Sequence, residues 1–132
     1  MKPRSIKLFV SITAKPEDVF VALTDAKKIA RWSGQKGKVA PKVGGKFEMF
    51  DGWVKGTVLE FKPGKLLAYT WVPDDWPEGA EESVVKYTLV PVKGGTKVVL
   101  EHSHFPNEDQ KKSHTGGWKE FVFDPLKDHF SK

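Results

Sequence analysis

Residues 116–132 read GGWKEFVFDPLKDHFSK, and this stretch decides the fold. Its apolar and aromatic residues recur with the spacing of one face of a helix. They are Trp118, Phe121, Val122, Pro125, Leu126, His129 and Phe130. A stripe this broad and this rich in aromatic rings needs a wide concave partner. The stretch therefore predicts a terminal helix held by a curved sheet, an arrangement that can serve as a core or as a container.

Pro125 interrupts this stripe. In the interior of a helix it removes one backbone hydrogen bond and kinks the helix, at a cost of about 3 kcal/mol. Alternatively, Asp124 caps a new helical segment that begins with Pro125. Either alternative predicts a bend in the terminal helix.

The residues before the terminal helix predict a sheet. Ile6, Leu8, Val10 and Ile12 alternate with other residues, as in a half-buried strand. The strands that we expect are 6–12, 46–50, 54–61, 66–72, 83–92 and 96–105. Two short helices, one beginning at Pro16 and one at 26–32, lie between the first two strands, and 34–45 and 105–113 are expected to be loops. Short turns make the sheet antiparallel, and its apolar face needs helices to cover it, so the fold class is α+β.

Composition limits the classes of protein. The 132 residues fit a single domain, 1–132, and the 39% apolar fraction argues against disorder. The absence of cysteine excludes a disulfide scaffold, a thiolate nucleophile and a Cys-ligated zinc site. The start shows no signal-peptide pattern, and the longest apolar run, 19–23, is too short to span a bilayer. We expect a cytoplasmic protein with no membrane span.

The net charge of +5 is unevenly spread. Residues 27–46 contain seven basic side chains and no acidic one, whereas residues 73–82 contain five acidic side chains and no basic one. Such asymmetry can steer a charged partner, or it can belong to two solvated loops. The basic segment has only one aromatic residue, Trp32, and no nucleic-acid motif accompanies it, so no nucleic-acid partner is expected.

Several segments together resemble one family. They are ITAKPEDVFVALTDAKKIARW near the start, GGKFEMFDGWVKGTVLEFKPGKLLAYTW, a Val-x-Tyr-x-Leu strand, WPEG at 76–79, GGTKVVLEHSHFP and GGWKEF. In this order and spacing they resemble the family of activators of the heat-shock protein 90 ATPase, over about residues 6–130.

The resemblance implies a helix-grip fold, the START-like or birch-pollen-allergen-like architecture. In that fold a curved antiparallel sheet, here of six strands, wraps a long C-terminal helix with a cavity between them, and two short helices lie between strands one and two. Relatives with this fold include co-chaperones, lipid and polyketide binders and a few catalysts, so the fold does not decide the function. The eukaryotic activators also carry a separate N-terminal domain, which these 132 residues do not include.

Histidines give one candidate site. His102 and His104 lie two apart on a strand, so they face the same way and could give two ligands to zinc, with His114 as a third. No acidic residue is spaced to complete the site. The alternative is that His102 is an inward polar residue and His104 lies at the end of the strand, and no metal is expected.

The space between sheet and terminal helix gives the second candidate site. It would hold a small hydrophobic or aromatic ligand, with Tyr69, Tyr87 and His102 orienting it. The lining expected is Trp32, Phe47, Met49, Tyr69, Trp71, Tyr87, His102, Trp118, Phe121, Val122 and Leu126. A filled core, in which the hydroxyls and the imidazole pair with one another, explains the same residues.

Catalytic motifs are missing from the sequence. There is no GxSxG elbow, no H-E-x-x-H and no phosphate-binding glycine loop, so no catalytic residue and no cofactor are expected. We therefore expect a non-enzymatic protein that binds a small hydrophobic ligand. The alternative is a module that binds heat-shock protein 90 and stimulates its ATPase, with Lys36, Lys38 and Lys42 meeting an acidic surface of the chaperone. A hydrolase or cyclase acting inside the cavity is the third reading.

Overall fold

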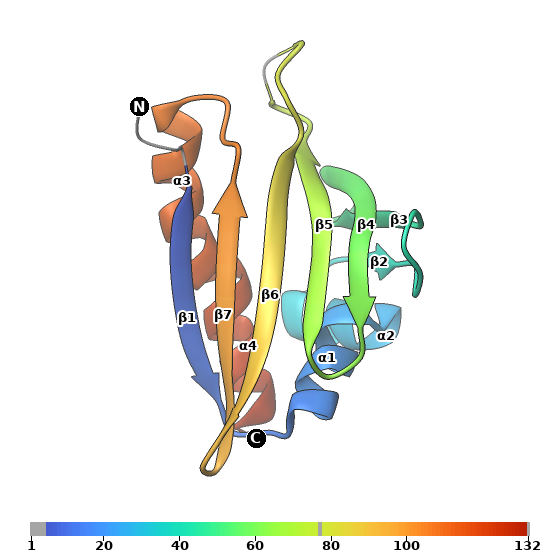
Figure 1. The fold of residues 1–132 in the computed structure, drawn as a ribbon, viewed down its shortest axis with the longest axis vertical. Helices are drawn as coiled ribbons and strands as arrows, with labels where there is room; N and C mark the ends of the chain where they lie inside the picture. The colour runs from blue at the N-terminus through green and yellow to red at the C-terminus, as the bar shows by residue number, and fades with distance from the viewer. Residues whose placement is uncertain (1–4, 77, 132) are drawn as a thin grey trace.

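A computed structural model describes residues 5–76 and 78–131. Pro77, in the middle of the WPEG motif, lies outside these described residues. Seven strands form one antiparallel sheet in the order β1-β7-β6-β5-β4-β3-β2. The strands are β1 Ile6–Ile12, β2 Lys38–Val39, β3 Lys46–Met49, β4 Val54–Lys62, β5 Leu66–Pro73, β6 Ser83–Val92 and β7 Gly95–Ser103. The helices lie on one side of this sheet (Figure 1). The α+β helix-grip class expected from the sequence is therefore confirmed.

The number of strands differs from the six expected. The additional strand, β2, lies inside 34–45, a segment whose many glycines and lysines predict a loop. Val39 pairs with Phe47 of β3, and both side chains are buried. One buried side chain is therefore enough to bring this short segment onto the edge of the sheet, and a segment of two residues is too short to show alternation.

Two helices carry the chain from one edge of the sheet to the other, because β1 and β2 are the two edge strands. Helix α1 is Pro16–Thr24, and it begins with proline and two acidic residues in its first turn, as expected. Helix α2 is Ala26–Ser33, and the Asp25 carboxylate caps it by accepting a hydrogen bond from the Lys28 amide at 3.1 Å. The indole Nε1–H of Trp32 donates to the Ala22 carbonyl at 2.7 Å, which holds the two helices together.

The terminal helix is longer than the sequence predicts, and it has three parts. These are α3 Glu108–Trp118, the π-helical segment η1 Lys119–Phe123 and α4 Asp124–Phe130. The expectation of a loop at 105–113 was wrong for its second half. Asn107 caps α3 by accepting from the Gln110 amide at 2.9 Å, and Glu108 and Asp109 occupy the first turn. These start signals were in the sequence, but the polar residues that follow show no apolar stripe.

Pro125 acts through the turn that precedes it. The Asp124 amide bonds to the Lys119 carbonyl, one residue farther back than in an α-helix. Asp124 has helical dihedral angles and its side chain caps nothing; it accepts from Lys119 Nζ at 3.0 Å instead. The π-turn lets the helix continue across a residue that has no N–H, so the expected new cap at Asp124 is wrong.

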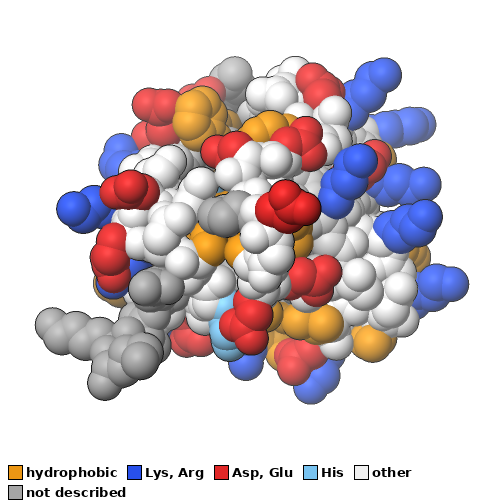
Figure 2. Space-filling view, turned by 90° about the horizontal axis from the view of Figure 1, so that it is seen from above, with side chains coloured by type: hydrophobic (Ala, Val, Ile, Leu, Met, Phe, Trp, Pro, Cys, Tyr) orange, Lys and Arg blue, Asp and Glu red, His pale blue; other side chains and the backbone are white. Residues whose placement is uncertain are grey.

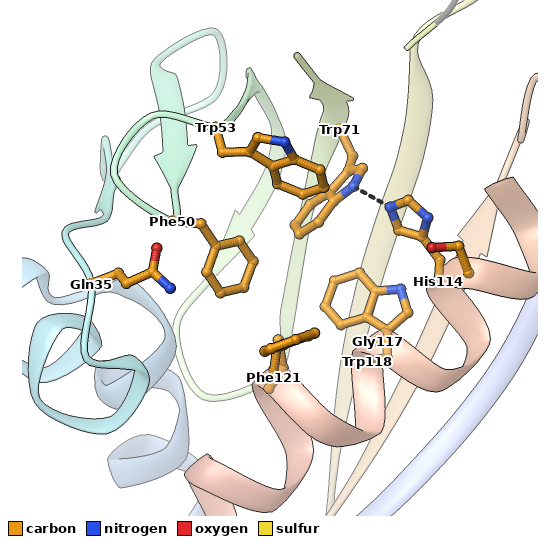
Figure 3. Close-up of a pocket in the computed structure, with 10 residues that line it drawn as sticks. Gln35, Phe50, Trp53, Trp71, His114, Gly117, Trp118 and Phe121 are labelled. Atoms are coloured by element: carbon orange, nitrogen blue, oxygen red, sulfur yellow. Dashed lines mark hydrogen bonds between the residues drawn. The ribbon is translucent and has the colours of Figure 1, made fainter. Parts of the chain in front are cut away.

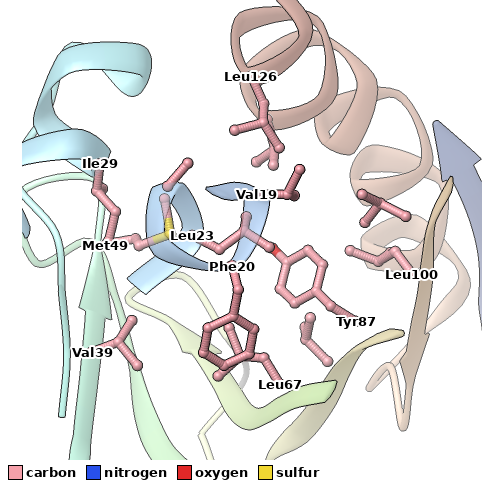
Figure 4. Close-up of a cluster of buried hydrophobic side chains, with 14 of the residues drawn as sticks. Val19, Phe20, Leu23, Ile29, Val39, Met49, Leu67, Tyr87, Leu100 and Leu126 are labelled. Carbon is pink, nitrogen blue, oxygen red and sulfur yellow. The ribbon is translucent and has the colours of Figure 1, made fainter. Parts of the chain in front are cut away.

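The core fills the space between the sheet and the helices. The largest fully buried side chains include Tyr69, Tyr87, Phe47, Leu100 and Leu126. Figure 4 shows Leu126 of α4 facing Val19, Tyr87 and Leu100 across this space. Apolar burial on this scale is the main term that stabilises the fold. The centre of the grip is therefore packed, and the open space lies elsewhere.

Candidate functional site: an aromatic pocket beside the terminal helix

His102 of β7 joins the sheet to the terminal helix. The indole Nε1–H of Trp118 donates to its Nδ1 at 3.0 Å, and its Nε2 lies 2.9 Å from the Ser83 hydroxyl oxygen. Because an indole can only donate, Nδ1 accepts and the ring proton is on Nε2. The Ser83 hydroxyl then donates to the carbonyl of Trp71. Both ring nitrogens are satisfied in the neutral state.

His114 of α3 makes the second connection. Its Nε2 accepts from the indole Nε1–H of Trp71 at 3.1 Å, and its Nδ1 lies 2.9 Å from the Gln110 carbonyl oxygen. By the same reasoning the ring is neutral, with its proton on Nδ1. The rings of His102 and His114 are 5.2 Å apart and nearly perpendicular. Two Trp–His hydrogen bonds, one in each direction, thus tie α3 to the sheet.

Burial keeps this histidine pair uncharged. It lowers the pKa of His102 from 6.5 to about 2, and the neighbouring His114 adds to the lowering. Burial also lowers the pKa of His114, although its hydrogen bond to Gln110 and the charge of Asp75 act in the opposite direction. The site therefore presents neutral imidazoles at physiological pH.

The two tyrosines expected to orient a ligand are paired with each other. The hydroxyl of Tyr69 donates to that of Tyr87 at 3.3 Å, and burial raises the pKa of both groups above 10. The ring of Tyr69 also stacks on Phe47 with the centroids 3.6 Å apart. These side chains belong to the packed core.

A pocket of about 430 Å³ opens beside this core, between the terminal helix and the turn that joins β3 to β4. Figure 3 shows aromatic rings on its opposite walls: Phe50, Trp53 and Trp71 from the sheet side, and Trp118 and Phe121 from the helix side. Its lining is Gln35, Phe50, Trp53, Trp71, Ser113, His114, Gly117, Trp118, Phe121 and Val122. This volume and apolar character are typical of a small-molecule site.

The residues expected to bind a ligand divide into two groups. Trp71, Trp118, Phe121 and Val122 line the pocket. The other expected residues, Trp32, Phe47, Met49, Tyr69, Tyr87, His102 and Leu126, are buried and lie outside its lining. Phe121 was expected to be a buried part of the helical stripe, but it is 54% exposed, while the unexpected Phe123 is buried. The longer turn of η1 shifts the residues after Trp118 around the helix, which a regular period cannot foresee.

Most of the pocket's rim is not evident from the sequence. Phe50 and Trp53 flank the Asp51-Gly52 turn, and the turn signal placed them together without showing which way they face. Gln35 and Gly117 carry no signal of their own. The sequence suggests His114 only as a metal ligand, because its contact with Trp71 joins residues 43 apart in the chain.

A second hollow, of about 620 Å³, lies between α2 and α4. Its lining is Arg31, Trp32, Glu120, Asp124, Pro125, Asp128 and His129. Charged side chains dominate these walls, so the hollow does not match the apolar ligand that the sequence suggests. Trp32, expected among the ligand-binding residues, faces this hollow and not the aromatic pocket.

The histidine metal site does not form. β7 ends at Ser103, and His104 takes a positive φ of 65° that turns its exposed side chain away from the face of His102. It lies next to the Ser103 hydroxyl, 3.0 Å away. Within 5–76 and 78–131, no group of three or more His, Cys, Asp or Glu side chains could hold a metal ion.

The lysine side chains of the basic segment lie on the surface, although its apolar residues Ile29, Trp32 and Val39 belong to the core. Lys36, Lys38 and Lys42 are exposed, and Lys38 stands opposite Glu48 in the pairing of β2 with β3. Figure 2 shows lysine and arginine side chains gathered on the right of the view, the side on which Figure 1 places β2, β3 and β4. No helix of the described residues is long and apolar enough to cross a membrane.

The chain is similar to known proteins over nearly its whole length. The family model described as "Activator of Hsp90 ATPase homolog 1-like protein" matches residues 13–131. An activator of 90 kDa heat shock protein ATPase homolog from Dictyostelium discoideum is 26% identical over 97% of this chain and 33% of its own length. The mouse activator homolog 1 is also 26% identical, over 95% of this chain and 36% of its own length. The chain thus spans about a third of the curated relatives it matches.

Solved structures give the same picture. An HSP90 activator from Plasmodium falciparum is 30% identical, with a TM-score of 0.77, over 89% of this chain and 90% of that one. A Mesorhizobium loti protein is 32% identical, with a TM-score of 0.77, over 94% of both chains. The family match covers nearly every element described above, from the end of β1 to the end of α4. This chain belongs to the family of Activator of Hsp90 ATPase homolog 1-like proteins.

Proposed function

We propose that this chain is a chaperone-binding module that stimulates the ATPase of an Hsp90-type chaperone in the cytoplasm. The observation that carries the proposal is the family match over residues 13–131, together with relatives named as activators of that ATPase. The packed centre of the grip supports it as well, because a filled core leaves the surface as the part of the domain that can meet a protein partner.

The docking surface that we propose is formed by the exposed lysines of the basic segment. Lys36, Lys38 and Lys42 carry positive charge, and no acidic residue interrupts 27–46. Such a surface favours an acidic partner and speeds the encounter with it. Solvent-exposed charges are screened over about 10 Å at 0.1 M salt, so the interaction should weaken as salt increases.

The test compares the ATPase rate of the chaperone with and without this protein at low ionic strength. The triple variant Lys36→Glu, Lys38→Glu and Lys42→Glu should lose the stimulation, because its surface then repels an acidic partner. The matched control reverses three other exposed lysines: Lys62 at the end of β4, Lys65 in the β4–β5 turn and Lys93 in the β6–β7 turn. It changes the net charge equally and should keep the stimulation. Unchanged stimulation by the first variant would count against this docking surface, and no stimulation by the unmodified protein would count against the function.

A second candidate function is the binding of a small hydrophobic ligand. The observation in its favour is the aromatic pocket of about 430 Å³, which lies beside the core and not in its centre. A compound that binds only the folded state raises the melting temperature by mass action. A broad library of lipid-like and aromatic compounds should therefore contain members that raise it, and a library without any such member would exclude this function.

A further inference from the structure

The walls of the pocket are flat and aromatic. The rings of Trp71 and Trp118 are 4.8 Å apart, which closes the bottom of the pocket. Phe50 meets Trp71 edge to face at 6.4 Å and Trp53 at 6.3 Å, which builds the wall on the sheet side. Aromatic rings prefer offset-stacked or edge-to-face partners. Walls of this kind complement a flat ring better than a flexible chain.

The π-turn places an aromatic ring at the mouth. Phe121 lies in the middle of η1 and is 54% exposed, although it lines the pocket. Trp53 stands across the mouth and is 38% exposed. Figure 3 shows both rings turned toward the space between them. Single π-turns are rare and occur often at functional sites. Large apolar rings left in water on both sides of a hollow favour a ligand that covers them.

The electrostatics of the pocket disfavour a charged ligand. None of the ten residues that line it is a lysine, arginine, aspartate or glutamate. His114 cannot supply a charge, because both of its nitrogens are engaged in the neutral state by Trp71 and Gln110. A charged group that entered would lose its hydration without gaining a partner.

Polar groups are available only at the rim. The side chains of Gln35 and Ser113 are exposed, line the pocket and have no hydrogen-bond partner among the described residues. An amide and a hydroxyl can each donate and accept a hydrogen bond. A single polar group on the ligand can therefore be met at the edge of the pocket while its rings remain inside.

We propose that this pocket binds an uncharged, flat aromatic ring system between Trp53 and Phe121, with one polar group at the rim, near either Gln35 or Ser113. The proposal rests on the second candidate function, the binding of a small ligand, and names the chemical class of that ligand. It is independent of any contact with a chaperone.

Two dyes that differ by one charge test the class. N-phenyl-1-naphthylamine is neutral and consists of flat aromatic rings, and its 8-sulfonate has the same rings and a negative charge. Titration followed by dye fluorescence should show one site for the neutral dye and at least about tenfold weaker binding of the sulfonate. Dodecanol, neutral but aliphatic, should compete poorly for this site.

Three single variants locate the site. Phe121→Ser and Trp53→Ser should each weaken binding of the neutral dye at least about tenfold, because each removes one side of the mouth. Both side chains are partly exposed, so the variants should fold, and circular dichroism checks this. Phe9→Ser is the control, because Phe9 is 64% exposed and lies on the outer face of β1. It should leave the affinity unchanged.

The outcomes separate the class of ligand from the function. Tighter binding of the sulfonate or of dodecanol than of the neutral dye would overturn the proposed class while leaving ligand binding intact. An equal loss of affinity in Phe9→Ser would overturn the location. If neither the dyes, nor dodecanol, nor any member of the compound library raises the melting temperature, ligand binding itself fails and the proposal fails with it.

Discussion

The residues that hold α3 to the sheet are two tryptophans and two histidines. Trp118 and His114 are the buried side chains of α3, and each makes one Trp–His hydrogen bond to the sheet, with His102 and Trp71. Each imidazole accepts from an indole with one nitrogen and donates with the other. The attachment therefore depends on both rings staying neutral, and it should respond to pH.

We expect the free energy of unfolding to fall as the pH falls below 6.5. The pKa of His102 is 6.5 when unfolded and about 2 when folded, so the unfolded state binds more protons between these values. The stabilising contribution is complete above pH 6.5 and is lost on acidification. Between pH 7.5 and pH 5.5 the loss from His102 alone should be about 1.4 kcal/mol. Urea unfolding at the two pH values measures it, and the exposed His104→Gln variant should show the same loss. A pH-independent free energy would contradict the neutral pair.

We expect Trp118→Phe to destabilise the protein by about 1–3 kcal/mol, because it leaves Nδ1 of His102 buried without its donor. Trp53→Phe is the matched control. Its indole N–H makes no hydrogen bond within the described residues, so its cost should be below about 0.5 kcal/mol. Urea unfolding of both variants gives the comparison. Equal costs would show that the indole-to-histidine bond contributes nothing.

The elements show which parts of the fold a sequence pattern can reveal. Period-two alternation predicted the strands at 6–12, 66–72, 83–92 and 96–105, and the turn signals at 51–52 and 63–64 bounded those at 46–50 and 54–61. The same reasoning failed for β2, which has a single buried residue, and for α3, whose buried face consists of His114 and Trp118 alone. A regular helical period also predicts that Phe121 is buried, whereas Phe123 is the buried residue, because a π-turn changes the period in the middle of the helix. The Trp71–His114 contact joins residues 43 apart in sequence, and no local pattern encodes it.

A helix attached by so few side chains should depend on its cap. We expect Asn107→Ala to cost about 0.5–2 kcal/mol and to speed amide exchange throughout Glu108–Trp118, because the Gln110 amide loses its acceptor. Asp25→Ala removes the corresponding cap of α2 and is the control. It should leave exchange in α3 unchanged. Faster exchange of α3 in the control, or none in Asn107→Ala, would contradict a locally held helix.

At the scale of the whole molecule, the first and last strands of the chain pair with each other. β1 and β7 run antiparallel from Ile6 opposite His102 to Ile12 opposite Thr96. The Thr96 hydroxyl also donates to the Ala14 carbonyl at 2.7 Å. At Gly95 an added Cβ would lie 2.1 Å from the Ile12 carbonyl oxygen, so the backbones approach too closely for any other residue. The pairing of β1 with β7 is therefore specified by the close approach of the two backbones as well as by apolar burial.

We expect Gly95→Ala to lower stability by about 1–3 kcal/mol, because the methyl group forces β1 away from β7. Gly116→Ala is the control. It lies inside α3 with open space around its Cβ position, and alanine should stabilise the helix by about 0.8–1 kcal/mol. Thermal unfolding measures both shifts. A neutral Gly95→Ala would show that the strands can separate without cost.

The pairing of β1 with β7 also limits the order in which the chain can fold. Ile6 pairs with His102, so β1, the first strand of the domain to be synthesised, can pair with β7 only after most of the domain has left the ribosome. Until then the apolar side of β1 has no sheet to join. Contacts so distant in sequence slow the search for the native state, so this domain should refold in milliseconds to seconds and not in microseconds. During synthesis the unpaired first strand is therefore open to association with another chain.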